Sequence, residues 1–161
     1  MPAPHPGDSG VSHVNVRMAT PTDLRELAEL FDGYRQFYRQ PADLERARDF
    51  IEERLTRNDS WILVAQRGDA LVGFSQLYPS FSSTHTSRIA ILNDLFVAAP
   101  GRRSGVATAV LLASQDLGRK LGLSALELST AIDNAGAQAL YEKYGWVRDT
   151  EFHVFTRSLT D

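Results

Sequence analysis

Residues 94–107 read DLFVAAPGRRSGVA, and this stretch decides the fold of the chain. Its apolar beginning is typical of a buried strand, which Pro100 and Gly101 end. Helical periodicity starts at Val106, so the stretch reads strand, turn and helix. Small residues in the turn let a ligand approach the backbone, and the first amides of the helix have no partner within the helix.

Two arginines, Arg102 and Arg103, add positive charge to this turn. The helix dipole adds more, so the turn is either an anion site suited to phosphate or an ordinary helix start with solvated arginines. Two other phosphate motifs are absent from the sequence. No Gly-Lys-Ser/Thr ends a P-loop, and no Gly-x-Gly-x-x-Gly opens a dinucleotide-binding turn.

The rest of the chain alternates between strand and helix patterns. We expect strands at Val14–Met18, Trp61–Ala65, Leu71–Tyr78, Arg88–Val97, Ala125–Ser129, Trp146–Val147 and Phe152–Arg157. We expect helices at residues 24–38, 44–55, 106–121 and 134–144, and a hydroxyl-rich loop at Pro79–Ser87. This order of elements predicts an α/β sandwich with a mixed sheet.

The composition is that of a soluble globular protein. The chain has 161 residues, of which 43% are hydrophobic, and this fits one domain over residues 13–161 after a flexible tail, residues 1–12. A net charge of -3 offers no general attraction to nucleic acid, and no apolar run is long enough for a membrane span. We expect a cytoplasmic protein, because the first residues lack the features of a secretion signal.

The residue types exclude cysteine chemistry and give no support to a metal site. The chain has no cysteine, so disulfides and a cysteine-bound intermediate are impossible. Four histidines, His5, His13, His85 and His153, are scattered without metal-ligand spacing, so we expect no metal site.

Two motifs, in this order, resemble the signatures of the GCN5-related N-acetyltransferase (GNAT) superfamily. The first is the loop 102–107, with the pattern Arg-x-x-Gly-x-Ala, preceded by the strand end at residues 94–97. The second is residues 134–146, which read NAGAQALYEKYGW. Together with the order of elements, the resemblance covers roughly residues 14–159.

The resemblance implies a GNAT-like α/β fold. Its mixed, mostly antiparallel central sheet would have roughly six to seven strands, splayed between the fourth and the fifth, and would be flanked by about four helices. Within the superfamily, residues 34–38 and 92–97 resemble the branch that contains Hpa2-type histone and polyamine acetyltransferases.

The resemblance also implies acetyl-CoA as co-substrate. Backbone groups of Leu95 and Val97 would hold the pantetheine arm between two splayed strands, and the amides of residues 103–108 would receive the pyrophosphate. Asn134 and Ala137 would line the other side of the cofactor. The implied cofactor-binding residues are Leu95, Phe96, Val97, Arg102, Arg103, Ser104, Gly105, Val106, Ala107, Thr108, Asn134, Ala137 and Tyr141.

The resemblance gives Tyr141 a catalytic role, because it would face the sulfur and protonate the departing CoA thiolate. A phenol suits this role, since a thiolate leaving group gains from a hydrogen bond or a proton. The alternative is a core tyrosine on a short amphipathic helix.

An amine must be neutral to attack a thioester, so a base is expected. Asp94 is the leading candidate, because a carboxylate inside an apolar strand is costly unless it is paired or used. It would act as the base, bind the cation of the substrate, or pair with an arginine. Polyamine-acetylating relatives often have an acid where this chain has Asn93, whose side chain would point away from Asp94 unless a bulge intervenes. Glu127, in the next strand, is either a second buried acid or a solvent-facing edge residue.

Aromatic side chains of the first helix are expected in the acceptor pocket, because their rings can pack on alkyl chains and hold a cation. Helical spacing explains Tyr34 and Tyr38 equally well as core residues, whereas Phe37 lies off that face and is the better pocket candidate. The expected substrate-binding residues are Tyr34, Phe37, Tyr38, Tyr78, Asn93, Asp94 and Glu127.

The resemblance thus implies an N-acetyltransferase that moves an acetyl group directly to a primary amine through a ternary complex. The acceptor would be a polyamine, an amino acid or a lysine side chain, with no nucleic-acid or membrane partner. Relatives in this branch often dimerise, so a homodimer is a further expectation. Two alternatives stay open: a non-catalytic acyl-CoA-binding regulatory module, and an N-acyltransferase that uses a longer acyl-CoA.

Overall fold

The computed structural model describes residues 13–160, and these fall into two compact units, residues 13–128 and residues 129–160. The expected flexible tail, residues 1–12, lies outside the described residues. The single domain expected over residues 13–161 stays a prediction.

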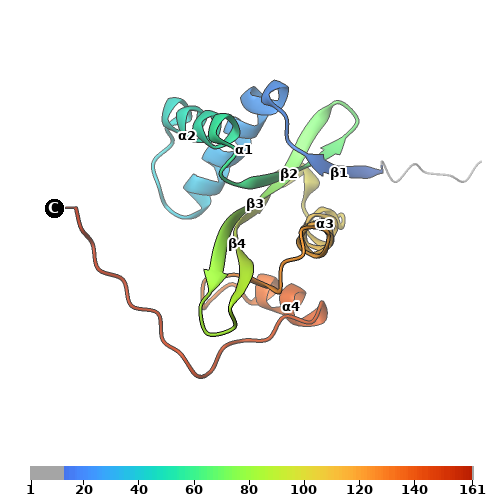
Figure 1. The fold of residues 1–161 in the computed structure, drawn as a ribbon. Coiled ribbons are helices and arrows are strands. Elements are labelled where there is room, and N and C mark those ends of the chain that lie inside the picture. The colour runs from blue at the N-terminus through green and yellow to red at the C-terminus, as the bar shows by residue number, and fades with distance from the viewer. Residues whose placement is uncertain (1–12, 161) are drawn as a thin grey trace, which may run out of the picture. The chain divides into compact units, whose positions relative to one another are not determined.

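The first unit is built around one five-stranded sheet (Figure 1). In chain order its elements are β1 (Val14–Met18), η1 (Pro21–Asp23), α1 (Leu24–Phe37), α2 (Leu44–Arg57), β2 (Trp61–Arg67), β3 (Ala70–Ser82), β4 (Ser87–Val97), η2 (Ala99–Gly101), α3 (Val106–Lys120) and β5 (Ala125–Glu127). The sheet order is β1-β2-β3-β4-β5, in which the first four strands pair antiparallel and β5 joins β4 in parallel. The mixed, mostly antiparallel sheet is confirmed, but it has five strands among the described residues where six to seven were expected.

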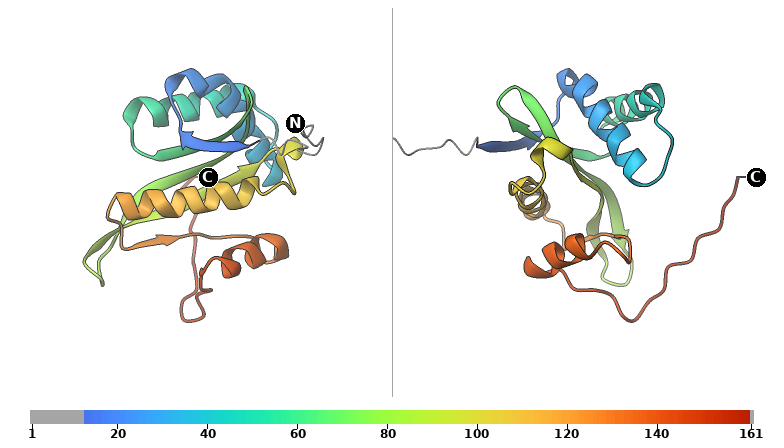
Figure 2. Two further views of the ribbon diagram at one scale, coloured as in Figure 1. Left: turned by 90° about the vertical axis from the view of Figure 1, so that its right-hand side faces the viewer. Right: turned by 180° about the vertical axis from the view of Figure 1, so that it is seen from behind.

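Helices cover both faces of this sheet (Figure 2). On one face, α1 and α2 bring Leu27 and Ile51 against Phe74 of β3, and all three are fully buried. On the other face, Val110 of α3 packs with Ala65 of β2. Successive residues of a strand point to opposite faces, so the inner strands supply side chains to both cores in turn.

The hairpin of β3 and β4 is longer than expected, and it corrects the predicted loop at Pro79–Ser87. β3 continues to Ser82, which pairs with Ser87, so the turn is confined to residues 83–86. Pro79 is tolerated in the strand because β2 pairs with β3 only as far as Leu77. Beyond that point β3 is an edge strand on the β2 side, where a missing amide hydrogen is acceptable.

β4 pairs with β5 over only part of its length, because β5 is short. Their pairing joins Ile89–Ile91 with Ala125–Glu127, and it ends there although β4 continues to Val97. Residues 92–97 of β4 therefore have no β5 partner, and the splay expected between the fourth and fifth strands stays a prediction.

The second unit contains helix α4 (Ala135–Lys143). The expected closing strands, Trp146–Val147 and Phe152–Arg157, are wrong for the described residues, because residues 146–160 contain no strand. Their alternating apolar side chains predicted strands, but a strand also needs a neighbour for its backbone groups, and a local pattern does not reveal whether one exists. The side chain of Phe152 is 77% exposed, as expected for a segment without such a neighbour.

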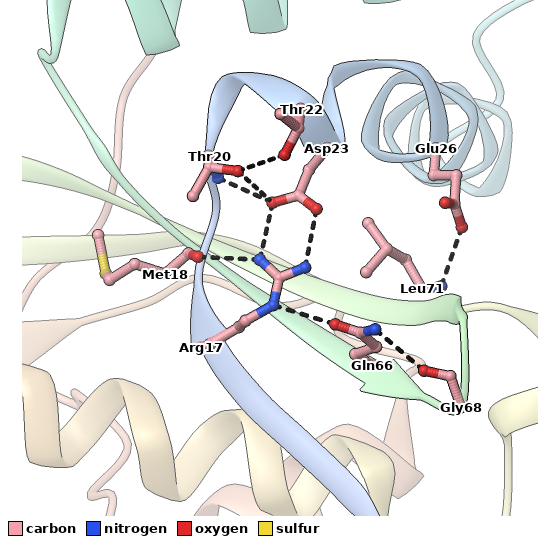
Figure 3. Close-up of polar contacts among 9 residues, drawn as sticks. All are labelled: Arg17, Met18, Thr20, Thr22, Asp23, Glu26, Gln66, Gly68 and Leu71. Carbon is pink, nitrogen blue, oxygen red and sulfur yellow. Dashed lines mark hydrogen bonds and ion pairs between the residues drawn. The ribbon is translucent and has the colours of Figure 1, made fainter.

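A polar network ties β1 to the start of α1 (Figure 3). The guanidinium of Arg17 donates to both carboxylate oxygens of Asp23, at 2.8 Å each, and to Gln66 of β2 at 3.1 Å. The amide of Thr20 also donates to Asp23, at 2.8 Å. The hydrogen bonds from Arg17 hold the pKa of the Asp23 carboxyl below its usual value. This network fixes the direction in which α1 leaves the sheet, and α1 carries aromatic residues of the candidate site.

Candidate functional site

A buried carboxylate lies at the centre of the candidate site. Asp94 of β4 is 1% exposed. Its Oδ2 accepts a hydrogen bond from Gln76 Nε2 at 2.7 Å, and its Oδ1 accepts one from Asn93 Nδ2 at 2.7 Å. The amide oxygen of Gln76 in turn accepts a hydrogen bond from Ser60 Oγ at 2.8 Å. Both carboxylate oxygens are therefore held by neutral amide donors.

A β-bulge brings Asn93 beside Asp94. The register pairs Gln76 with Asp94 and the next residue of β3 with Leu92, so Asn93 is an extra residue in β4. In a regular strand the two neighbouring side chains would point to opposite faces. The bulge lets both side chains meet, and the carbonyl oxygen of Asn93 accepts a hydrogen bond from Tyr34 Oη at 3.1 Å.

Burial is the largest influence on the pKa values of Asp94, Tyr34 and Tyr78. It raises the pKa of the Asp94 carboxyl, although the hydrogen bonds that the carboxyl accepts act in the opposite direction. Burial, followed by the negative charge of Asp94, raises the pKa of Tyr78 to about 12 and also raises the pKa of Tyr34. Both phenols therefore stay protonated near neutral pH, whereas Asp94 accepts a proton more readily than an exposed aspartate.

These contacts narrow the three roles considered for Asp94. Within residues 13–160, no arginine forms an ion pair with this carboxylate, so pairing with an arginine is not what holds it. Neutral amides stabilise its charge without neutralising it. The remaining roles are those of a base and of a binding group for a cation.

Aromatic rings of α1 and β3 lie near this carboxylate. The ring centres of Tyr34 and Tyr38 are 5.0 Å apart, in an edge-on contact, and Tyr34 also packs against the core. Phe37 and Tyr38 are 56% and 44% exposed at the end of α1, so Phe37 lies outside the core, as its position off the helical face predicted. Tyr78 is half-buried in β3.

Glu127 does not belong to the buried cluster. Its side chain is exposed, which corrects the expectation of a second buried acid and matches the solvent-facing alternative. β5 is the outer strand of the sheet and ends at this residue, so the core does not cover the side chain. A part for Glu127 in acceptor binding stays a prediction.

The turn before α3 is held in shape by side chains at its ends. Ser104 Oγ donates to the carbonyl oxygen of Gly101 at 2.6 Å and accepts a hydrogen bond from Arg67 at 2.9 Å. Arg102 Nε donates to the carbonyl oxygen of Val97 at 3.0 Å, so this arginine links the turn to the end of β4. The turn is therefore a defined shape and not a loose connection.

Two residues of the turn have a left-handed backbone, with φ angles of 60° at Arg103 and 80° at Gly105. The first hydrogen bond of α3 runs from the Ala109 amide to the Gly105 carbonyl oxygen. The amides of residues 106–108 precede that bond and have no acceptor within the helix. With the helix dipole and the exposed arginines, these donors suit the oxygens of a diphosphate.

The second predicted motif lies on α4. Asn134 caps this helix, because its Oδ1 accepts a hydrogen bond from the Ala137 amide at 3.1 Å. Tyr141 is half-buried, and its ring centre lies 5.9 Å from that of Trp146. The structure thus brings Asn134 and Ala137 together. Their contact with a cofactor, and the catalytic role of Tyr141, stay predictions.

Sequence reasoning missed Gln76 and Ser60. Gln76 carries a signal, because it is a polar residue between Phe74 and Tyr78 on one face of its strand. Ser60 carries none, since a serine just before a strand is ordinary in connecting segments.

Over residues 13–160, none of the helices combines the length and the apolar character of a membrane span. In the same part of the chain, no three side chains of His, Cys, Asp or Glu come together where a metal ion would be held.

Comparison with known proteins places this site in context. The model of the acetyltransferase (GNAT) family matches residues 24–146. The uncharacterized N-acetyltransferase YhfO of Bacillus subtilis (strain 168) is 42% identical over 139 residues, which cover 86% of this chain and 93% of the relative. A probable acetyltransferase of Haemophilus influenzae is 30% identical over 95 residues, which cover 58% of this chain and 65% of the relative.

Solved structures show the same architecture. The crystal structure of a probable acetyltransferase, 40% identical, superposes with a TM-score of 0.85 and covers 91% of this chain and 99% of its own. The aminoglycoside N-acetyltransferase AAC(6')-Iy, solved in complex with CoA, is 22% identical, with a TM-score of 0.76 over 92% of this chain and 97% of its own. At that identity the second likeness shows the fold alone.

Proposed function

Because this chain belongs to the acetyltransferase (GNAT) family and is an N-acetyltransferase, we propose that it transfers an acetyl group from acetyl-CoA directly to a cationic primary amine. The acceptor is a polyamine, an amino acid or a lysine side chain, as in the Hpa2-type branch that residues 34–38 and 92–97 resemble. The observation that carries this proposal is the buried Asp94 carboxylate, which neutral amides hold and no described arginine neutralises.

The turn before α3 supports binding of the donor. Enzymes of this family use acetyl-CoA, which supplies the acetyl group as a thioester. The amides of residues 106–108 are unpaired donors for its pyrophosphate, and the left-handed glycine at 105 leaves the approach to them free of a side chain. Arg103 is exposed in the same turn and adds positive charge. Residues 103–108 would therefore hold the pyrophosphate.

The short pairing of β4 with β5 supports binding of the pantetheine arm. Beyond Ile91 the backbone of β4 has no β5 partner and could pair with an added extended segment, although the Val97 carbonyl oxygen already accepts a hydrogen bond from Arg102. The arm would lie there in the manner of a short strand. Asn134 and Ala137 would also contact the cofactor, as the second motif implies.

Asp94 would handle the proton of the acceptor. A primary amine is protonated at neutral pH and cannot attack a thioester in that form. The negative charge of Asp94 attracts the ammonium group, and its raised pKa lets it take one proton before the nitrogen bonds to the acetyl carbon. Binding a cation and acting as base are thus successive roles of one group. Tyr141 would give a proton to the departing sulfur and regain one from the attacking nitrogen through solvent.

The two phenols near Asp94 support a cationic acceptor. Tyr78, with its pKa raised to about 12, and Tyr34 stay neutral, so neither repels Asp94 nor competes with it for the proton. A neutral aromatic ring attracts a cation over its face. Exposed Phe37 and Tyr38 would contact the alkyl part of a long amine.

Release of free CoA tests this function, measured with a dithiobis-nitrobenzoate reagent across a panel of amines and matched alcohols. The chain has no cysteine, so the reagent reports the released CoA alone. We expect thiol release with polyamines or lysine analogues and none with the alcohols. Tight binding of acetyl-CoA without release for any amine would instead identify a non-catalytic acyl-CoA-binding module. Faster turnover with propionyl- or succinyl-CoA would identify a longer-chain N-acyltransferase.

A further inference from the structure

A chain of buried hydrogen bonds leads to Asp94 from the connection between α2 and β2. Ser60 Oγ donates to Gln76 Oε1 at 2.8 Å, and Gln76 Nε2 donates to Asp94 Oδ2 at 2.7 Å. The three residues are 8%, 0% and 1% exposed. Water therefore does not replace a lost hydrogen-bond partner here. The loss of one hydrogen bond in the chain weakens the next one.

The amide of Gln76 has two different ends, and only one suits an ionised Asp94. Its NH2 end donates a hydrogen bond to the carboxylate. If the amide were reversed, its oxygen would face a carboxylate oxygen, and two acceptors cannot form a hydrogen bond. The hydroxyl of Ser60 donates to the amide oxygen and so keeps that end turned away from Asp94. A protonated Asp94 would favour the reverse, because its O–H would donate to the amide oxygen. The direction of this amide is thus coupled to the charge of Asp94.

We propose that Ser60 and Gln76 are positioning residues for the acetyl transfer, which fix the direction of the Gln76 amide and thereby keep Asp94 ionised and ready to accept a proton. This inference rests on the proposed function, in which Asp94 contacts the acceptor amine. Ser60 and Gln76 act through the hydrogen-bond chain that ends on Asp94 Oδ2, and the contact with the amine is left to Asp94.

Other titratable or charged groups face this cluster from the neighbouring elements. Tyr34 comes from α1 and Tyr78 from β3, and the raised pKa of each phenol lies well above neutrality. Arg54 of α2 pairs with Asp59 at 2.9 Å, and both influence Tyr78. None of these four side chains is altered in the variants below. A change in the pH profile between roughly pH 5 and 9 therefore reports the protonation of Asp94.

The test is the pH dependence of kcat/KM for the amine, measured on the full chain for Ser60→Ala and Gln76→Met. The first variant removes only the hydroxyl, and the second keeps the side-chain volume but removes the donor. We expect the acidic limb of the profile to move to higher pH by about one unit, which is about a tenfold loss of activity on that limb. Activity should recover at high pH, and the KM for acetyl-CoA should not change.

Two further variants separate positioning from stability. Ser60→Thr keeps the hydroxyl and should restore the wild-type profile. Ser114→Ala is the matched control, because Ser114 Oγ is also fully buried and lies 2.9 Å from Ser75 Oγ, on the α3 side of the sheet. This control should lower the melting temperature and leave the pH profile in place.

An unmoved profile in both Ser60→Ala and Gln76→Met, or an equal loss of activity at every pH, would overturn the inference, since a purely structural role changes stability and not protonation. If Gln76→Met does not fold, Ser60→Ala decides alone, because it removes a single heavy atom. A wild-type protein that releases no CoA thiol with any amine overturns the proposed function itself. A wild-type protein that is active, with unshifted variants, overturns only the positioning role.

Discussion

Asn93 Nδ2 lies 2.7 Å from Asp94 Oδ1, although the two residues are adjacent in one strand. The bulge in β4 makes this contact possible, because it places Asn93 outside the regular alternation of side chains. An acid at position 93 would repel the carboxylate, whereas the amide donates to it. At this point of β4 a single buried acid therefore has a neutral neighbour, and there is no pair of acids sharing a proton.

Changing Asn93 should alter the pH profile in a graded way. The hydrogen bond from Asn93 lowers the pKa of Asp94, so Asn93→Leu should raise that pKa and move the acidic limb of the rate profile up by about one unit. Asn93→Asp should move it further, because two adjacent carboxylates resist joint ionisation. Thiol release measured from pH 5 to pH 9 checks this, with exposed Asn15→Leu as control. Coincident profiles for the wild type and Asn93→Asp would show that the contact does not tune Asp94.

Replacing Gly105 should separate cofactor binding from folding. The site has open space for a side chain, but its φ of +80° strains any residue other than glycine, by about 1–2 kcal/mol. Gly105→Val should also block the amides of the turn and weaken acetyl-CoA binding at least about tenfold.

Gly68→Val is the matched control for this prediction, because Gly68 also has a left-handed backbone and open space, in the turn between β2 and β3. Calorimetry should show a similar loss of stability for both variants and a loss of affinity for Gly105→Val alone. Equal affinity in the two variants would mean that the turn before α3 does not hold the cofactor.

Tyr141→Phe tests the predicted acid. Loss of a proton donor to the leaving thiolate should lower kcat about a hundredfold, while the dissociation constant for acetyl-CoA changes little. Tyr144→Phe, at the end of the same helix, removes an equivalent hydroxyl and should leave kcat close to wild type. Steady-state kinetics with thiol detection measure both, and an unchanged kcat in Tyr141→Phe would remove this residue from the mechanism.

The ion pair at the start of α1 should make stability depend on pH. The pKa of Asp23 is lower in the folded chain than its ordinary value of 3.8, so its contribution is present above that value and is lost as the pH falls through the folded pKa. Asp23→Asn should therefore cost about 1 kcal/mol of unfolding free energy at pH 7 and progressively less at an acidic pH below 3.8, as the pH falls through the folded pKa. Denaturant unfolding at the two pH values measures this difference.

Asp116→Asn is the control for the ion pair, because Asp116 meets Arg119 at the same 2.8 Å distance but is 63% exposed. Solvent screens such a pair, so no measurable change is expected at either pH. A loss in Asp23→Asn that is as small as that of Asp116→Asn would contradict a structural role for the network of Figure 3.

The centre of the candidate site was predictable, but its surroundings were not. Asp94 stands out locally, because a carboxylate in an apolar strand needs an explanation. Its partner Gln76 lies on another strand, and the bulge at Asn93 depends on the register between the two strands. Register is set by the whole sheet, so a local pattern does not contain it.

The elements of the fold show the same limit. The turn before α3 was predictable because proline, glycine and helical periodicity are local signals. Pro79 was misread as a loop residue, since its place in β3 depends on where β2 ends. The strand expected at Phe152–Arg157 was wrong. Alternating apolar and polar residues fit a strand, but they do not show whether a neighbouring strand is present to pair with it.

Because β5 ends at Glu127, the second half of an inner strand has the property of an outer one. From residue 92 onward, one side of the β4 backbone has no β5 partner, and unpaired strand backbone readily accepts a strand from another chain. A bound cofactor arm along that side would exclude such additions. Acetyl-CoA would then protect this protein against misassembly, and the empty enzyme would be the form that aggregates first.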